Sequence, residues 1–329
     1  MRAVVMDSFG AADVMHLDEV ASPAPTEHQV LIEVAATSVN RPDVIQRQGR
    51  YPPPPGESQI LGLECAGRVV AVGAMVESPA IGDRVFALVG GGAYAELAVA
   101  DAAHTLPIPQ DYSYEQAACI AETYITAYLN LFQNAQLTNG ESVLLHGGGG
   151  GVNTAAIGLV DSLCPKSTII VTASPSKIDR VIGLGADLVI DYHTQRFPDE
   201  IKRFTEKAGV DVILDHIGAD YFEPNLESLA INGRLVIIGI MQGSDTKLSL
   251  GRLMIKRQRI IGSVLRPRTN VEKARIIADF AHTIMPLFES GRIEPVIDSV
   301  LPIDEVVDAH RRMEAGEHFG KIVLKFERK

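Results

Sequence analysis

The chain has 329 residues, of which 46% are hydrophobic and 22% are charged. This composition is typical of a soluble globular protein and argues against a disordered or fibrous one. The length predicts about two domains, each able to bury a core without disulfides or a structural metal. The formal net charge of −11 argues against non-specific binding to nucleic acid or to an anionic membrane.

Cysteine usage and hydropathy indicate a cellular compartment. Cys65, Cys119 and Cys164 are widely spaced and form no CxxC pair, which argues against a disulfide framework and a four-cysteine zinc site. The opening MRAVVMDSFG lacks the apolar segment of a signal peptide. No run approaches the ~20 apolar residues of a membrane span. We therefore expect a protein of the reducing cytoplasm.

The first third of the chain is rich in short strand-like runs. Val, Ile and Ala cluster between Gly and Pro residues, which predicts a small β-rich domain. The expected strands cover residues 2–7, 30–39, 67–76, 83–89 and 93–100. Between the second and third of these strands, the pattern allows Asp43 to cap a helix that starts at Val44. Pro52 to Pro55 predict a stiff extended loop.

The middle of the chain has a different pattern. Residues 112–133 have the apolar spacing of a helix. Six apolar runs then alternate with helical segments, at residues 142–147, 167–173, 187–192, 210–218, 233–240 and 259–265. Continuous apolar runs are typical of strands buried on both faces. The pattern predicts an α/β fold in which a doubly wound parallel six-stranded sheet carries helices on both sides.

The last part returns to the first pattern. We expect a helix at 271–291, a strand at 296–303, a helix at 304–316 capped by Asp304, and a strand at 320–326. A β-rich opening and a β-containing end that flank an α/β block indicate a discontinuous domain. The predicted boundaries are 1–122 and 267–329 for the β-rich domain, with a cofactor-binding domain at 123–266 inserted between its two parts.

Five consecutive glycines, Gly147 to Gly151, follow a predicted strand and precede a predicted helix. In that context glycines let backbone N–H groups approach a pyrophosphate, and the helix N-terminus favours the anion. The next strand lacks the terminal acid that binds the ribose 2′-hydroxyl of NAD. Its end carries Ser174 and Lys177 instead, which fit a 2′-phosphate. With Arg180, Lys177 also fits a solvated helix face, but the missing acid favours NADPH.

The sequence also predicts the absence of zinc. Catalytic zinc sites use Cys, His and carboxylate ligands, yet residues 38–43 contain no Cys, and Gly62-Leu63-Glu64 replaces a possible Gly-His-Glu. We therefore expect no metal ligands. Reduction of a carbonyl or quinone that tolerates negative charge needs a Lewis acid less than alkoxide chemistry does.

Several blocks together resemble the zinc-independent, zeta-crystallin-like NADPH:quinone oxidoreductases of the medium-chain dehydrogenase/reductase superfamily. They are NRPDVIQRQGRYPPPPGESQILGLECAGRV, GGGGGVNTAAI, DHIG, GRLVIIGIMQG and GKIVL. The resemblance implies a GroES-like catalytic domain, a Rossmann domain, NADPH-dependent quinone reduction in an interdomain cleft, and a homodimer. One departure is Asn153, where the family turn usually ends in glycine, which puts the pyrophosphate geometry in doubt.

The resemblance also assigns roles to individual residues. It places Asn40, Tyr51 and Asp43 at the catalytic site, with Tyr51 and Asp43 in the block that lines the quinone pocket. It places the following residues around NADPH: Asn40, Thr126, Gly150, Gly151, Val152, Ser174, Lys177, Tyr192, Ile217, Ile240, Met241, Leu265, Arg266 and Lys321. Each has an ordinary structural alternative, such as loop bonding for Asn40, packing for Tyr51 and solvation for Lys321. His146 and His216 are expected to be structural.

Three functions remain open from the sequence. The first is hydride transfer from NADPH to a quinone, with Asn40 and Tyr51 as hydrogen-bond donors to the developing charge and the proton taken from solvent or Tyr51. The second is NADPH-dependent reduction of an activated alkene, such as an enone or 2-alkenal. The third is a non-catalytic NADPH-binding or RNA-binding protein, against which the net charge argues.

Overall fold

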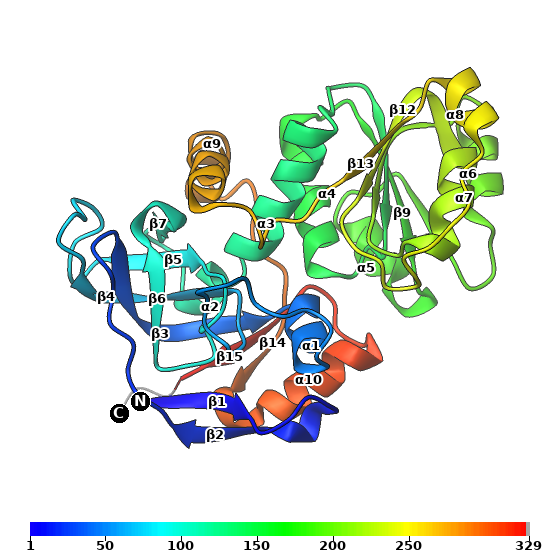
Figure 1. Cartoon of the computed structure of the whole chain (residues 1–329). Helices are drawn as coiled ribbons and strands as arrows, with labels where there is room; N and C mark the ends of the chain where they lie inside the picture. Colours follow the sequence, from blue (N-terminus) through cyan, green and yellow to red (C-terminus); the bar gives the residue numbers. More distant parts are fainter. Residues whose placement is uncertain (327–329) are drawn as a thin grey trace. The chain divides into compact units, whose positions relative to one another are not determined.

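The computed structural model describes residues 1–326 and divides the chain into two compact units. Unit 1 joins Met1–Ile125 to the segment that starts at Arg266, whereas unit 2 is continuous over Thr126–Leu265. Helix α3 (Ala121–Tyr128) contains the first of these boundaries. Unit 1 is therefore built from two separated stretches of sequence, with all of unit 2 between them (Figure 1).

Unit 2 is built on a parallel sheet whose strands, within residues 126–265, follow the order β10-β9-β8-β11-β12-β13. The strands are β8 (Ser142–His146), β9 (Thr168–Ala173), β10 (Leu188–Asp191), β11 (Val210–Asp215), β12 (Leu229–Ile237) and β13 (Arg259–Gly262). This is the doubly wound order of a Rossmann fold. The prediction of six parallel strands is confirmed.

Helices cover both faces of this sheet. Figure 1 shows α4 and α5 on one side and α6 and α7 on the other. The helices are α4 (Gly151–Leu163), α5 (Ile178–Gly183), α6 (Phe197–Phe204), α7 (Ala219–Ser228) and α8 (Leu250–Lys256). The central strands are apolar throughout because both faces are covered, and Val143, Leu144 and Leu145 are fully buried. Because the strands of this sheet are parallel, their carboxyl ends lie at the same edge, where such sheets bind ligands.

Unit 1 contains a mixed sheet that, within residues 1–326, has the order β14-β15-β3-β4-β5-β7, with β6 also paired to β3. Its strands are β3 (Gln29–Val39), β4 (Glu64–Val72), β5 (Arg84–Leu88), β6 (Leu97–Asp101), β7 (Thr105–Pro107), β14 (Ile297–Pro302) and β15 (Lys321–Lys325). A separate antiparallel pair is formed by β1 (Arg2–Met6) and β2 (Met15–Glu19). The predicted GroES-like β-rich fold is confirmed.

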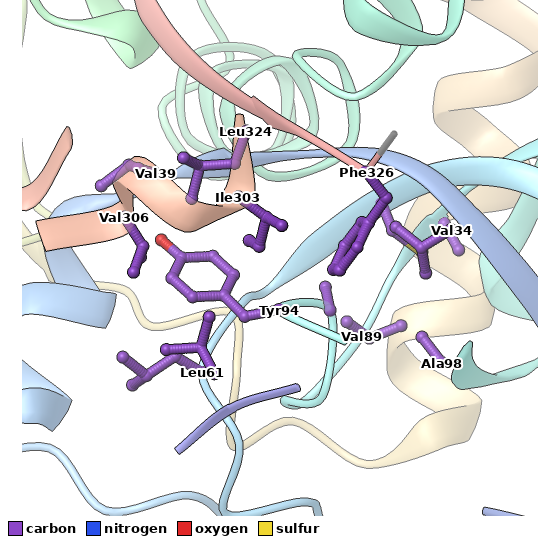
Figure 2. Close-up of a cluster of buried hydrophobic side chains, with 14 of the residues drawn as sticks. Val34, Val39, Leu61, Val89, Tyr94, Ala98, Ile303, Val306, Leu324 and Phe326 are labelled. Atoms are coloured by element: carbon purple, nitrogen blue, oxygen red, sulfur yellow. The ribbon is translucent and has the colours of Figure 1, made fainter. Parts of the chain in front are cut away.

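The two stretches of unit 1 are joined by strand pairing. Strand β15 lies antiparallel to β3, with Ile322 opposite Val39. The helices of this unit are α1 (Arg41–Arg47), α2 (Tyr114–Ala117), the start of α3, α9 (Asn270–Glu289) and α10 (Val306–Ala315). Figure 2 shows the fully buried ring of Tyr94 among aliphatic side chains, with its hydroxyl on the side of Val306.

Three sequence predictions about helices were wrong in detail. The helix expected at 112–133 is interrupted between α2 and α3 and ends as a π-helical segment, Leu129–Asn134. Helix α1 begins at Arg41 rather than Val44, because Asn40 is its N-cap and Asp43 completes a capping box three residues later. Helix α10 begins at Val306 after a short 3₁₀ turn, so Asp304 is not its N-cap.

Candidate functional site

The glycine turn of unit 2 joins β8 to α4 at the carboxyl edge of the sheet. Gly147 has φ +74°, and a Cβ on Gly148 would lie 2.3 Å from the Cγ1 of buried Val171. These positions therefore require glycine. The N-cap of α4 is Gly150, which has no side chain to accept hydrogen bonds from the first-turn N–H groups. Those groups suit a pyrophosphate.

Asn153 holds this turn from inside the first turn of α4. Its Nδ2 donates to the carbonyl of His146 and, at 3.1 Å, to the carbonyl of Gly147. Its side chain is almost completely buried, and its Oδ1 meets no hydrogen-bond partner among residues 1–326. The asparagine that departs from the family pattern thus links the helix to the end of β8 in place of a close glycine contact.

His146 belongs to a buried network that ties three strand ends together. Its Nδ1 lies 3.1 Å from Thr172 Oγ1, and its Nε2 lies 2.7 Å from Asn225 Oδ1. Asn225 in turn donates to Asp215 at 3.2 Å. Burial lowers the pKa of His146 to about 3, so the imidazole is neutral and donates through Nε2 to the amide oxygen. The network fixes the strand ends around the glycine turn.

The end of β9 carries the side chains that were expected to recognise a 2′-phosphate. After Ala173 the chain turns through Ser174 and a 3₁₀ segment ending at Lys177. The aliphatic part of Lys177 lies against Gly149, where a Cβ would be 2.4 Å from its Cδ and 3.2 Å from its Nζ. The ammonium group is therefore beside the glycine turn. A basic side chain at this place attracts a phosphate whether it belongs to the pyrophosphate or to the ribose.

The neighbouring strand ends complete the candidate cofactor site of unit 2. Tyr192 follows β10 and is 43% exposed, with its ring stacked on His193 at 4.6 Å. The loops after β11 and β12 are joined by a hydrogen bond of 2.7 Å from Gln242 N to Ile217 O. In the loop after β12, Ile240 is 58% exposed and Met241 is 48% exposed. Such exposed apolar side chains beside a glycine turn suit the flat face of a nicotinamide.

Two expected cofactor residues lie at the ends of unit 2. Thr126 is its first residue, on α3, and its carbonyl accepts a 2.8 Å hydrogen bond from Asn130 Nδ2. Leu265 is its last residue and is buried. Their proposed contacts with a cofactor stay predictions.

Unit 1 contains a cluster of buried charged and polar groups around Asn40 and Glu64. Lys321 Nζ lies 3.0 Å from Glu64 Oε1 and donates to Asn40 Oδ1 at 2.6 Å. Glu64 Oε1 also accepts hydrogen bonds from Ser38 Oγ at 2.6 Å and Asn40 Nδ2 at 2.9 Å. Both ends of the Asn40 amide are thereby oriented by an ion pair whose side chains are at most 4% exposed.

Asp43 adjoins this cluster, and its carboxylate accepts hydrogen bonds from two backbone N–H groups. Its Oδ2 accepts from Asn40 N at 2.8 Å, and its Oδ1 accepts from Gly62 N at 3.0 Å. The Tyr94 hydroxyl lies 3.4 Å from the same carboxylate and 3.1 Å from His310 Nε2. Burial raises the pKa of Asp43 to about 6. Asp43 is fully buried, and we place it as a residue that positions Asn40.

Arg266 and Tyr51 form a second group of side chains in unit 1, in which Arg266 is buried and Tyr51 is half-buried. The guanidinium donates to Gly90 O from Nε at 2.8 Å and to Gln46 Oε1 from Nη2 at 2.7 Å. It also lies 5.2 Å from the centroid of the Tyr51 ring. Burial is the main cause that raises the pKa of Tyr51 above its usual value. The ring and the guanidinium together offer a flat surface to an aromatic acceptor.

In unit 1 the structure joins Asn40, Asp43 and Lys321 in one hydrogen-bonded cluster and pairs Arg266 with Tyr51. The glycine turn lies in unit 2. Sequence reasoning missed two acidic residues beside the unit 1 cluster: Glu64, the partner of Lys321, and Glu122, whose N–H donates to Glu64 Oε2 at 2.8 Å. Glu64 was noted only as a departure from a zinc motif, and Glu122 lay within an expected helix. Within residues 1–326, no group of three or more His, Cys, Asp or Glu side chains is arranged to hold a metal ion.

Comparisons with known proteins agree with this architecture. The chain matches the alcohol dehydrogenase GroES-like domain over residues 26–110 and the zinc-binding dehydrogenase family over residues 184–324. It is 35% identical over 330 residues to the quinone oxidoreductase of Lama guanicoe, covering 98% of this chain and 97% of that protein. It is also 32% identical over 340 residues to the human synaptic vesicle membrane protein VAT-1 homolog, covering 98% and 86%.

Two solved structures are similar over nearly their whole length. Escherichia coli quinone oxidoreductase in complex with NADPH has a TM-score of 0.89 at 26% identity, with 99% of this chain and 100% of that chain covered. CurK enoyl reductase has a TM-score of 0.88 at 26% identity, with 99% of each chain covered. A GroES-like unit and a Rossmann unit with these relatives define an oxidoreductase that uses a nicotinamide nucleotide. The chain belongs to the medium-chain dehydrogenase/reductase superfamily and, within it, to the quinone oxidoreductase-like proteins.

Proposed function

We propose that the protein is an NADPH-dependent reductase of quinones that works without zinc. The observation that carries this proposal is the end of β9, where Ser174 and Lys177 stand in place of a carboxylate beside the glycine turn. A carboxylate there would repel a 2′-phosphate, whereas an ammonium group attracts it. When bound, NADPH supplies the hydride. The chain's own residues bind, orient and protonate.

Unit 2 would hold the cofactor. The N–H groups of Gly151 and Val152 would meet the pyrophosphate at the start of α4. Gly150, whose own N–H donates to Gly147 O at 3.0 Å, would let the phosphate approach the backbone because it has no side chain. Three side chains would surround the 2′-phosphate, namely Ser174, Lys177 and Tyr192. The apolar residues at the ends of β11 and β12 would line the adenosine ribose and the nicotinamide, namely Ile217, Ile240 and Met241.

Unit 1 would receive the acceptor. Tyr51 and Arg266 provide a flat, partly apolar surface, and Asn40 is held in one orientation by Lys321 and Glu64. The cation of this cluster is an amino acid, Lys321, hydrogen-bonded to Asn40 at 2.6 Å. Its positive charge would help stabilise negative charge that develops on a nearby acceptor oxygen. This observation supports chemistry without a bound metal.

The alternative acceptor is an activated alkene. The similarity to CurK enoyl reductase favours it, since hydride then goes to carbon rather than to a quinone. An RNA-binding role is disfavoured by the net charge of −11, and a salt-dependent RNA shift would revive it.

The experiment measures NADPH oxidation with a panel of quinones and with a 2-alkenal, and compares kcat/KM. Quinones are expected to give the higher values. A folded, NADPH-saturated protein that turns over no quinone would refute the proposal, and a higher value for the alkenal would favour the alternative. NADH in place of NADPH is the matched control for the cofactor.

We also propose that two copies associate through β13. This strand is at the edge of the unit 2 sheet, and Ile260 and Ile261 are only half-buried. An edge strand presents backbone groups that another chain can pair with. Light scattering is expected to show a dimer, and a monomer at micromolar concentration would contradict this.

No helix of residues 1–326 is long and apolar enough to cross a membrane. The three cysteines are free and buried, and burial raises the pKa of Cys65 to about 12. The cytoplasmic location expected from the sequence stays a prediction.

A further inference from the structure

Glu122 is a second acidic residue beside Glu64 in unit 1. It lies in the first turn of α3, and its backbone N–H donates to Glu64 Oε2 at 2.8 Å. The side chain is half-buried, and within residues 1–326 no hydrogen bond to its carboxyl group is present. The carboxyl oxygens are not among the sealed, unpartnered polar atoms of the described chain. The group therefore borders accessible space.

The charges around Glu122 disfavour its ionised form. Burial is the largest cause, and together with the negative charge of Glu64 it raises the pKa of Glu122 to about 8. Asp43 adds a smaller repulsion, whereas Lys321 and Arg266 oppose the shift. Lys321 is already paired with Glu64 and hydrogen-bonded to Asn40, so its charge is shared. At neutral pH the Glu122 carboxyl group holds a proton.

Glu122 is close to the surface proposed for the acceptor. Glu64 accepts from Glu122 N through Oε2 at 2.8 Å and from Asn40 Nδ2 through Oε1 at 2.9 Å, so Glu122 adjoins the cluster that orients Asn40. When ionised, Glu122 also raises the pKa of Tyr51. Arg266 lies over the Tyr51 ring. Its N–H groups donate hydrogen bonds to the carbonyls of Gly90 and Tyr51 and to the side-chain oxygen of Gln46. Burial raises the pKa of Tyr51 above its usual value, so the Tyr51 hydroxyl keeps its proton at neutral pH. Among Tyr51, Arg266 and Glu122, Glu122 has the most acidic proton, and within residues 1–326 no hydrogen-bond acceptor for that proton is present.

We propose that Glu122 is the proton donor to the reduced acceptor. This inference rests on the proposed reductase function. A quinone that has gained a hydride is a hydroquinone anion and needs one proton. The O–H bond of Glu122 breaks as an O–H bond forms on the anionic oxygen, and the carboxylate then regains a proton from water. The overall change is quinone plus NADPH plus H⁺ to hydroquinone plus NADP⁺.

A protonated carboxyl group suits this step better than an ionised one, because proton transfer is most effective when the donor pKa is near the working pH. The nearby Glu64 carboxylate raises the energy of the product state, in which Glu122 is also charged. Lys321 and Arg266 limit that cost. The same balance returns the proton from water once the product has left.

Infrared spectroscopy tests the proton without turnover. Wild-type protein is expected to show a protonated-carboxyl band that disappears as the pH rises through about 8. Glu122→Gln removes this band, whereas Glu115→Gln, a half-buried glutamate on α2, leaves it in place. A wild-type spectrum without the band at pH 7, or a band that persists in Glu122→Gln, would overturn the inference.

Kinetics then test the role. With a quinone acceptor, Glu122→Gln is expected to lower kcat at least tenfold and to remove the loss of kcat above pH 8. Glu122→Asp is expected to keep part of the rate with a displaced pH profile. A Glu122→Gln variant with the wild-type rate and pH profile would refute the proton donor but leave the reductase function intact. A wild-type protein without reductase activity would overturn both.

Discussion

Replacing Lys321 by methionine is the sharpest test of the unit 1 cluster. The ammonium group lies 3.0 Å from Glu64 Oε1, and the side chains are only 4% and 0% exposed. At an effective dielectric constant of about 20, two unit charges at this distance attract by about 5.5 kcal/mol. Part of this is offset because the ammonium group no longer has to be desolvated. Removing one partner of a buried pair is expected to cost about 3–5 kcal/mol of folding free energy.

Urea-induced unfolding at pH 7, followed by tyrosine fluorescence, measures this cost. The chain has no tryptophan, so tyrosine dominates the emission. Five of its eight tyrosines lie in unit 1, namely Tyr51, Tyr94, Tyr112, Tyr114 and Tyr124. The signal therefore reports mainly on the unit that contains the substitution.

Two further variants make the result decisive. Arg311→Met breaks exposed pairs with Asp13 and Asp308 in the same unit, in which Arg311 is 54% exposed, and is expected to cost less than about 1 kcal/mol. Combining Lys321→Met with Glu64→Gln removes the uncompensated charge and should recover part of the loss. A Lys321→Met variant as stable as Arg311→Met, or a double variant with no recovery, would refute the idea that this buried ion pair stabilises unit 1.

Three other predictions concern unit 2 and Glu122. Lys177→Ala is expected to weaken NADPH binding by about 1–3 kcal/mol, or roughly 5- to 150-fold, and NADH binding less; an equal loss in a fluorescence titration of both cofactors would show that Lys177 meets the pyrophosphate instead. Asn153→Ala removes two hydrogen bonds at the glycine turn and should cost about 1–3 kcal/mol of folding free energy. It should also lower the affinity for both cofactors. Unchanged hydrogen exchange at Gly147 and Gly148 would contradict the inference that Asn153 holds this turn. Glu122 has a pKa of about 8 in the folded protein, above its unfolded value, so its contribution to the free energy of unfolding is complete at acid pH and is lost as the pH rises through 8. Glu122→Gln should therefore raise the Tm relative to wild type more at pH 9 than at pH 6. An equal difference at both pH values would contradict the shifted pKa.

The sequence was most informative about unit 2, and the reason is physical. Its strands are buried on both faces, so each is a continuous apolar run that stands out between polar helices. Strand β2 was missed because in Met15–Glu19 only Met15 is buried. Helix α8 was missed because its apolar residues Leu250, Met254 and Ile255 are exposed and form no core-facing stripe.

The candidate site was predictable only in part. The glycine turn is local, so spacing and context reveal it. The cluster around Glu64 is not local, since Lys321 is 257 positions away along the chain and reaches it only because β15 pairs with β3. Whether Asp43 is an N-cap or the third residue of a capping box depends on which N–H groups it meets. Glu122 belongs to no sequence motif. Its raised pKa depends on burial and on charged residues that are distant in the sequence, such as Glu64 and Lys321.

The interruption of unit 1 by unit 2 has a consequence for biosynthesis. During translation, residues 126–265 emerge as an uninterrupted stretch and contain every strand of their own sheet. Strand β3 is made before unit 2, but its partner β15 leaves the ribosome only after all of unit 2 has been made. Until then Glu64 lacks the ammonium group of Lys321. The nascent chain can thus complete the sheet of unit 2 first, and the sheet of unit 1 is completed only once β15 has emerged.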